Sequence, residues 1–191
     1  MPNALVVGGP NGAGKSTFAT EYLTERDQRY LSADHIASEI NPDAPEEAKI
    51  QAGKAFLRRL RQSIQARESV VVESTLAGRG MGRMLERFRE ADYTVAIVFI
   101  FVDTPKACIR RVRERVRRGG HDVPRSDIVR RFYRSAINFW EQYRYQIDHW
   151  YLFSNAGDQF REVAFGTDAR YTVTDEDHFD LFLQIISEAN E

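Results

Sequence analysis

The residues with the clearest chemical meaning form one glycine-rich octapeptide near the start of the chain. Residues 9–16 read Gly-Pro-Asn-Gly-Ala-Gly-Lys-Ser, which matches the pattern G-x-x-x-x-G-K-[ST] and follows the apolar run Ala4–Val7. Glycines allow successive backbone N–H groups to converge on an anion, while the lysine suits β- and γ-phosphates and the serine hydroxyl suits Mg²⁺. A glycine-rich turn that binds nothing is the alternative, but a strand before the loop and a helix after it favour a phosphate site. We therefore expect ATP or GTP to be bound through Gly9, Pro10, Asn11, Gly12, Ala13, Gly14, Lys15, Ser16 and Thr17.

A carboxylate after the second apolar run could act as a base. Asp34 follows the weak strand candidate Arg29–Ser32. Transfer of a phosphoryl group to a hydroxyl needs a group that accepts the hydroxyl proton, and Asp34 is placed for that role. The alternative is that Asp34 caps the helical turn that follows it.

Polar residues after two further apolar runs could complete the site. Glu73 follows Val70–Val72 and could hold Mg²⁺ together with Ser16, or pair with a nearby arginine instead, and Thr75 could hydrogen-bond the substrate. Asp103 follows the strongest apolar run, where capping of the next helix is favoured over a role at Mg²⁺. Farther on, the segment 154–157 could contact the nucleotide base.

Arginines are concentrated in the segment 106–134. It carries eleven Lys and Arg residues against three acids, and ten of the eleven are arginines. Two helical patterns flank the turn-forming segment 119–124, which is typical of a mobile lid, and we expect the lid to cover about residues 113–134. Two guanidinium groups are expected on the γ-phosphate, one from Arg117 or Arg118 and one from Arg130 or Arg131, with Arg118 and Arg131 preferred. A solvated helix face and a nucleic-acid site are the alternatives.

Apolar runs alternate with helical patterns along the chain. This order predicts an α/β fold of the P-loop NTPase type, with a parallel sheet covered by helices on both faces. Ligands of such sheets bind at the carboxyl ends of the strands, where the polar residues named above lie. The expected strands are 4–7, 29–32, 70–72, 94–102, 151–154, 160–165 and 171–173. The expected helices are 16–24, 45–67, 80–91, 105–118, 126–147 and 175–189.

Two of these helices carry specific expectations about their side chains. The helix 45–67 should bury Ile50, Phe56, Leu57, Leu60 and Ile64 along one side. The helix that starts near Ser126 should be capped by the hydroxyl of that residue.

Length and composition fit a single domain spanning residues 1–191. Hydrophobic residues make up 42% and charged residues 29%, as in ordinary globular proteins. The N-terminus shows no secretory signal, and the longest apolar run, Val95–Val102, is too short to cross a bilayer. Cys108 is the single cysteine, which excludes an internal disulfide, and we expect it to be half-buried and structural. These features predict a cytoplasmic protein without a membrane partner.

Several motifs together resemble the zeta toxin family of P-loop kinases over most of the chain. They are the loop 9–17, the step 32–34, the Glu73-Ser74-Thr75 element and the arginine-rich lid. The segment 118–124 looks more like the small zeta-like ATPases of bacteria, and the region between Asp34 and Glu73 is more compact than in the toxins.

The resemblance implies roles for these residues. Asp34 would be the catalytic base, Glu73 and Thr75 would lie at the substrate and magnesium site, and lid arginines would act on the γ-phosphate. The family's best-known acceptor is UDP-N-acetylglucosamine, so a small-molecule hydroxyl is the expected acceptor. An antitoxin partner is left open. The alternatives are a kinase of another metabolite or nucleoside, and a nucleotide-dependent ATPase that binds RNA or protein.

Overall fold

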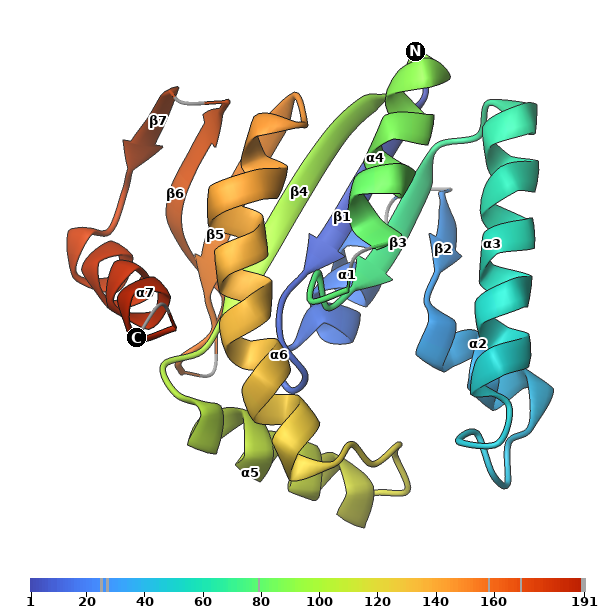
Figure 1. Cartoon of the computed structure of the whole chain (residues 1–191), viewed down its shortest axis with the longest axis horizontal. Helices are drawn as coiled ribbons and strands as arrows, with labels where there is room; N and C mark the ends of the chain where they lie inside the picture. Colours follow the sequence, from blue (N-terminus) through green and yellow to red (C-terminus); the bar gives the residue numbers. More distant parts are fainter. Residues whose placement is uncertain (25, 27, 79, 158, 169, 190–191) are drawn as a thin grey trace.

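The computed structural model describes residues 1–24, 26, 28–78, 80–157, 159–168 and 170–189. One seven-stranded sheet, of order β2-β3-β1-β4-β5-β6-β7, forms the centre (Figure 1). Its strands are β1 Asn3–Gly8, β2 Arg29–Leu31, β3 Val70–Ser74, β4 Thr94–Phe101, β5 His149–Ser154, β6 Arg161–Thr167 and β7 Arg170–Val173. The helices are α1 Lys15–Leu23, α2 Ala33–Ile40, α3 Lys49–Ala66, α4 Gly80–Glu90, α5 Pro105–Arg117, α6 Arg125–Ile137 and α7 Glu176–Glu188. The predicted α/β class is confirmed.

The predicted parallel sheet is present over five strands, and the last two strands extend it in the antiparallel sense. β6 pairs antiparallel with β5, and β7 pairs antiparallel with β6. A parallel neighbour requires a crossover of a dozen or more residues. The connections after β5 and after β6 are far shorter, so the chain can only turn back as hairpins.

The strands present alternate residues to the two faces of the sheet. On one face Val6, Val72 and Phe99 pack with α4, α6 and α7, which lie in front of the sheet in Figure 1. On the other face Val7 and Val98 pack with α1. The predicted coverage of both faces is therefore confirmed, and the parallel strands all end on the side where α2 and α5 lie (Figure 1).

Two expectations about helix ends were wrong. α6 begins at Arg125 after Pro124, and Ser126 lies inside the helix without capping it. The cap of α5 is Thr104, whose hydroxyl accepts the Ala107 N–H, rather than Asp103. In both places proline fixes the backbone two residues away from the polar side chain that the sequence favoured.

The long helix expected over 126–147 is interrupted. α6 ends at Ile137 and continues as a π-helical turn, Asn138–Gln142, and a short 3₁₀ turn, Tyr143–Tyr145. Phe139 lies in the π-helical turn and stacks on Phe99 with ring centroids 4.6 Å apart. The change of helix type coincides with the packing of aromatic side chains against β4.

The inner side of α3 differs from the prediction. Ile50 is 76% exposed and Leu57 is 45% exposed, whereas Ala52, Ala55 and Leu60 are buried.

Cys108 on α5 is fully buried rather than half-buried, and burial raises the pKa of its thiol to about 12. Within the described ranges, no helix has the length and apolar character that a bilayer crossing requires.

Candidate functional site

The glycine-rich loop lies between the end of β1 and the start of α1. Gly14 precedes the helix with φ 94°, a left-handed conformation, and a Cβ there would lie 2.5 Å from Asn155 Nδ2. A Cβ on Gly12, at φ 81°, would lie 2.8 Å from the Cys108 carbonyl oxygen. The loop therefore needs glycine at these positions both for its backbone conformation and for space. Lys15 and Ser16 open the first turn of α1, where backbone N–H groups are free for an anion.

The loop lysine is buried beside a carboxylate. Lys15 is 6% exposed, its Nζ donates to the Pro10 carbonyl at 3.0 Å, and it lies 4.0 Å from Glu73 Oε1. Burial lowers the pKa of Lys15, while the charges of Glu73 and Asp34 act in the opposite direction. Ser16 Oγ donates to Glu73 Oε2 at 2.9 Å. The end of β3 thus brings Glu73 to both loop side chains that the sequence assigned to phosphate and metal.

Tyr30 is a site residue that the sequence analysis missed. Its hydroxyl, on β2, donates to Glu73 Oε2, the same oxygen that accepts from Ser16. Burial, followed by the charge of Glu73, raises the pKa of Tyr30, so the phenol stays protonated and remains a donor. Because the contact joins residues on different strands, no local motif marks it.

Removal of the Tyr30 hydroxyl should raise the Mg²⁺ concentration that nucleotide turnover requires. In Tyr30→Phe, Glu73 loses the donor that orients it, and we expect about a tenfold rise in the Mg²⁺ concentration that gives half-maximal nucleotide turnover. The measurement is a Mg²⁺ titration at saturating nucleotide. Tyr133→Phe is the matched control, because the Tyr133 hydroxyl also donates to a carboxylate, that of Glu188, on the α6–α7 side of the molecule. An unchanged Mg²⁺ requirement in Tyr30→Phe would contradict the role.

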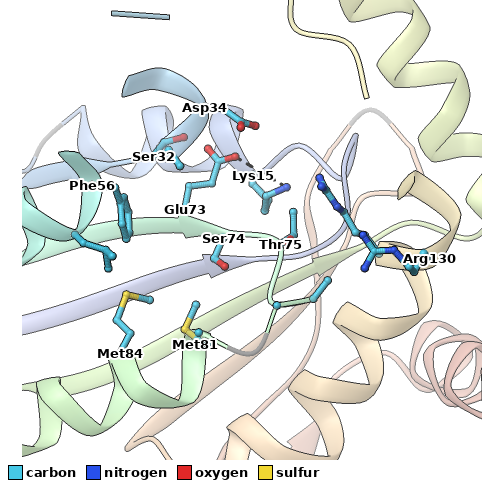
Figure 2. Close-up of a pocket in the computed structure, with 16 residues that line it drawn as sticks. Lys15, Ser32, Asp34, Phe56, Glu73, Ser74, Thr75, Met81, Met84 and Arg130 are labelled. Carbon is cyan, nitrogen blue, oxygen red and sulfur yellow. Dashed lines mark ion pairs between the residues drawn. The ribbon is translucent and has the colours of Figure 1, made fainter. Parts of the chain in front are cut away.

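A cavity of about 470 Å³ opens beside the loop, at the carboxyl ends of the strands (Figure 2). It brings together Lys15, Asp34, Glu73 and Thr75, which the sequence had placed on three separate segments. The cavity is lined by Lys15, Ser32, Ala33, Asp34, Phe56, Leu57, Glu73, Ser74, Thr75, Ala77, Gly78, Gly80, Met81, Met84, Arg130 and Arg131.

Asp34 does not cap the helix on which it lies. The side chain of Ser32 caps α2 by accepting the His35 N–H at 3.4 Å. Asp34 lies in the first turn of α2, is exposed, and lines the cavity near Lys15 (Figure 2). The capping alternative is thereby removed, and the carboxylate is left available to a ligand.

The arginines that follow the segment 119–124 reach the site. Arg131 Nη1 donates to Asn11 Oδ1 of the loop at 3.2 Å, and its Nη2 lies 3.6 Å from Asp127. Arg130 pairs with Asp127 at 2.9 Å and lines the cavity with Arg131. Both come from the first half of α6.

The arginines before the segment 119–124 lie elsewhere. Arg118 is the exposed C-cap residue that follows α5, and it is absent from the described lining of the cavity. Arg117 lines a separate groove on the outer side of α5. The imidazole of His121, in the segment 119–124, contacts the carboxylate of Glu46 in the segment before α3. The segment 119–124 thus contacts the segment that leads into α3, and the roles expected for Arg117 and Arg118 remain predictions.

Two further residues, one on α5 and one after β5, contact the loop. Arg111 on α5 donates to the carbonyl of Asn155 at 2.7 Å and to that of Gly12 at 3.4 Å. Asn155 in turn donates through Nδ2 to the Ala13 carbonyl at 2.8 Å. The segment 154–157, which we expect to contact the base, therefore adjoins the loop, although only its position in the sequence pointed to it.

Oxygen donors are present for a magnesium ion. Mg²⁺ prefers hard oxygen ligands and commonly takes most of them from phosphates and water. Ser16 Oγ and the Glu73 carboxylate lie within hydrogen-bond distance of each other beside the loop, so both fit such an ion. In the ranges that the structure describes, no group of three or more His, Cys, Asp or Glu side chains could hold a metal.

Solved structures share the fold at low sequence identity. The AvrRxo1-ORF1:-ORF2 complex with ATP superposes over 97% of this chain with a TM-score of 0.73 at 16% identity, and the present chain spans 64% of that protein's length. The PezAT toxin–antitoxin system of Streptococcus pneumoniae gives a TM-score of 0.63 at 17% identity, covering 100% of this chain and 88% of the other. A gluconokinase from Sinorhizobium meliloti 1021 gives 0.52 at 18% identity, covering 98% and 89%. The fold is thus that of P-loop kinase-like proteins.

Sequence comparison gives the family directly. An uncharacterized protein from Haemophilus influenzae is 31% identical over 127 residues, which is 66% of this chain and 89% of that protein. The family model described as an AAA domain matches residues 5–133, more than half of the chain and the part that carries the glycine-rich loop, Asp34, Glu73 and the lid arginines. The chain therefore belongs to this family of AAA domains.

Proposed function

We propose that this protein is a Mg²⁺-dependent phosphotransferase that moves the γ-phosphoryl group of ATP, or GTP, to a hydroxyl of a small molecule. One observation carries the proposal: a single cavity contains the loop lysine, the Asp34 carboxylate and two arginines of α6. A protein that only binds and releases nucleotide needs the lysine and the loop. It does not need a carboxylate such as that of Asp34, which caps no helix and lines the cavity beside the loop. Phosphoryl transfer to an alcohol needs all of these groups.

The chain's own residues divide the work. Asp34 accepts the proton of the acceptor hydroxyl, whose oxygen then bonds to the γ-phosphorus as the bond to the β-phosphate oxygen breaks. Lys15 neutralises charge on the β- and γ-phosphates, and Arg131, with Arg118 on closure of the lid, does so on the moving group. Thr75 hydrogen-bonds the acceptor. Arg131 already contacts Asn11 of the loop, which supports its assignment.

A bound magnesium ion would be held by Ser16 and Glu73 and would supply charge neutralisation between the β- and γ-phosphates. Tyr30 orients the carboxylate of Glu73 for this purpose. The loop residues from Gly9 to Thr17 would bind the phosphates mainly through backbone N–H groups. Such a protein would work on cytoplasmic metabolites.

The resemblance to zeta toxins makes UDP-N-acetylglucosamine the first acceptor to test, with other metabolites and nucleosides next. The structural similarity to the PezAT toxin–antitoxin system supports this order and keeps an antitoxin-like protein partner under consideration.

The test is incubation of the purified chain with γ-labelled ATP and Mg²⁺, with and without each acceptor. Label on an acceptor, absent from Asp34→Asn, would support the proposal. Normal ATP binding with no label on any acceptor would refute it.

A second candidate function follows from the outer groove of α5. This groove, of about 330 Å³, is lined largely by cations: Lys106, Arg110, Arg113, Arg117 and Arg125. Such a row of cations suits a phosphate backbone, so a nucleotide-dependent RNA-binding protein is the alternative. RNA affinity would then fall steeply as salt rises, and Asp34→Asn would leave it unchanged. A fluorescence-polarisation titration at two salt concentrations separates the two functions.

A further inference from the structure

The cavity beside the glycine-rich loop has two chemically different ends. Lys15, Arg130 and Arg131 supply positive charge at the end next to the loop. The opposite end is an apolar wall, formed by residues of α3, α4 and the segment between β3 and α4. We define the apolar wall as Phe56, Leu57, Ala77, Met81 and Met84. Figure 2 shows Phe56, Met81 and Met84 on the side away from Arg130, with Asp34 and Lys15 between the two groups.

Packing of the core does not account for the whole of this wall. Leu57 is 45% exposed although it lines a cavity, and it belongs to none of the buried clusters. Met81 and Met84 are 5% and 8% exposed, so each keeps a small accessible area that faces this space. Leucine exposed in a concave site is open to an apolar ligand group, and methionine adapts to ligands of irregular shape.

A polar band separates the apolar wall from the cations. Ser32, Asp34, Ser74 and Thr75 line the cavity between the two ends, and Asp34 lies closest to the reaction proposed above. A ligand that reaches from the wall to Asp34 meets apolar atoms first and hydrogen-bonding groups second. A ligand that fits the cavity must therefore carry an apolar group at one end and hydrogen-bonding groups next to it.

We propose that the acceptor is a molecule whose reacting hydroxyl lies next to an apolar group of about the size of a ring, such as an aromatic glycoside, a nucleoside or an aryl-substituted alcohol. This inference rests on the proposed phosphotransferase function. The apolar group contacts the apolar wall, and the hydroxyl lies at Asp34. The hydroxyl oxygen bonds to the γ-phosphorus, the bond to the β-phosphate oxygen breaks, the proton passes to the Asp34 carboxylate, and ADP (or GDP) leaves with the electron pair of the broken bond.

The same wall disfavours a small polyol. A free sugar that fills the cavity would bring hydroxyl groups against Phe56, Leu57 and Met84, which offer them no hydrogen-bond partner. Hydroxyl groups that lose water without gaining a partner weaken binding. The cavity should therefore distinguish two compounds with the same reacting hydroxyl when only one of them carries the ring.

Matched pairs of compounds test this directly. The probes are phenyl β-glucoside against glucose, and uridine against ribose, with UDP-N-acetylglucosamine as a charged comparison. Equilibrium dialysis measures Kd for the full chain loaded with Mg²⁺ and a non-hydrolysable ATP analogue, and γ-labelled ATP measures transfer in a parallel assay. We expect at least about a tenfold lower Kd for the ring-bearing member of each pair.

Single substitutions identify the residues on which the preference for ring-bearing compounds depends. Leu57→Gln, at a partly exposed position that should tolerate the change, is expected to remove most of the preference by raising Kd for phenyl β-glucoside about tenfold without altering Kd for glucose. Met84→Leu keeps an apolar surface and should retain the preference. Leu183→Gln is the matched control, because Leu183 is 36% exposed on α7 and does not line the cavity, so this change should alter neither value.

Equal Kd values within both pairs, no binding by either ring-bearing compound, or a preference that survives Leu57→Gln would overturn the inference. Tight binding of UDP-N-acetylglucosamine that Leu57→Gln leaves unchanged would overturn the inference in favour of a charged acceptor. A ring preference that depends on Leu57, with no label on any acceptor, would support the ring site and refute the phosphotransferase proposal.

Discussion

Asp34→Asn is expected to reduce phosphoryl transfer by about 10²- to 10⁴-fold while leaving the Kd for ATP within about twofold. The amide keeps the shape of the side chain but cannot accept the acceptor proton. Because Ser32 rather than Asp34 caps α2, the change removes no cap and should leave the thermal midpoint nearly unchanged. Single-turnover transfer and ATP binding by calorimetry, on the same preparation, separate the two effects.

Asp43→Asn is the matched control for this change. Asp43 is an exposed carboxylate on the segment between α2 and α3 and does not line the cavity. It should retain full transfer. If Asp34→Asn and Asp43→Asn transfer phosphate equally well, Asp34 is not the base. If Asp34→Asn loses ATP binding as well, the carboxylate acts on the nucleotide site rather than on the acceptor.

Lys15→Met is expected to lower nucleotide turnover by about 10²- to 10³-fold and to raise the thermal midpoint at neutral pH. The loss of turnover follows from removing the positive charge that stabilises the transferring phosphates. The gain in stability follows from the burial of Lys15. Burial lowers its pKa in the folded state below that in the unfolded state, so folding disfavours the charged form that prevails at neutral pH. A neutral side chain of similar length avoids that cost.

The difference in thermal midpoint between Lys15→Met and wild type should depend on pH. A cationic group with a lowered folded-state pKa destabilises the fold below that pKa, and the penalty disappears as the pH rises through the unfolded-state pKa. The difference in midpoint between Lys15→Met and wild type should therefore shrink at alkaline pH. Lys54→Met, at an exposed lysine on α3, is the control and should alter neither turnover nor midpoint. A lower midpoint for Lys15→Met at neutral pH would show that its contacts with Pro10 and Glu73 outweigh the burial cost.

Local patterns predicted most of the fold because the relevant signals are short. The seven strands and the helices around them follow from apolar runs, prolines and glycines, and the octapeptide forms the loop expected at the end of β1. The rule that polar residues meet at the carboxyl ends of parallel strands predicted the proximity of Lys15, Asp34 and Glu73, which line one cavity. The antiparallel direction of the last two strands was not predicted because strand patterns carry no direction, although the short connections contained the information.

The unpredicted parts of the site depend on contacts between distant segments. Tyr30 looks like an ordinary strand aromatic until β2 is paired with β3, which places its hydroxyl on Glu73. Arg111 is one arginine among ten in its segment, and only the packing of α5 against the loop distinguishes it. Leu57 was expected to be buried because helical spacing cannot tell a core-facing residue from a cavity-facing one. In each case the chemistry depends on tertiary pairing rather than on spacing along the chain.

The order of the strands also bears on how the chain folds. β1 is synthesised first, yet its neighbours in the sheet are β3 and β4, so that Ala4 is paired with Val70 on one side and with Val95 on the other. Such non-local pairing makes loop closure costly and folding slow. The glycine-rich loop is then fixed only when Arg111 and Asn155 arrive from still later segments. Competence to bind nucleotide should thus be acquired late in folding, which makes nucleotide binding a sensitive reporter of complete folding during synthesis or refolding.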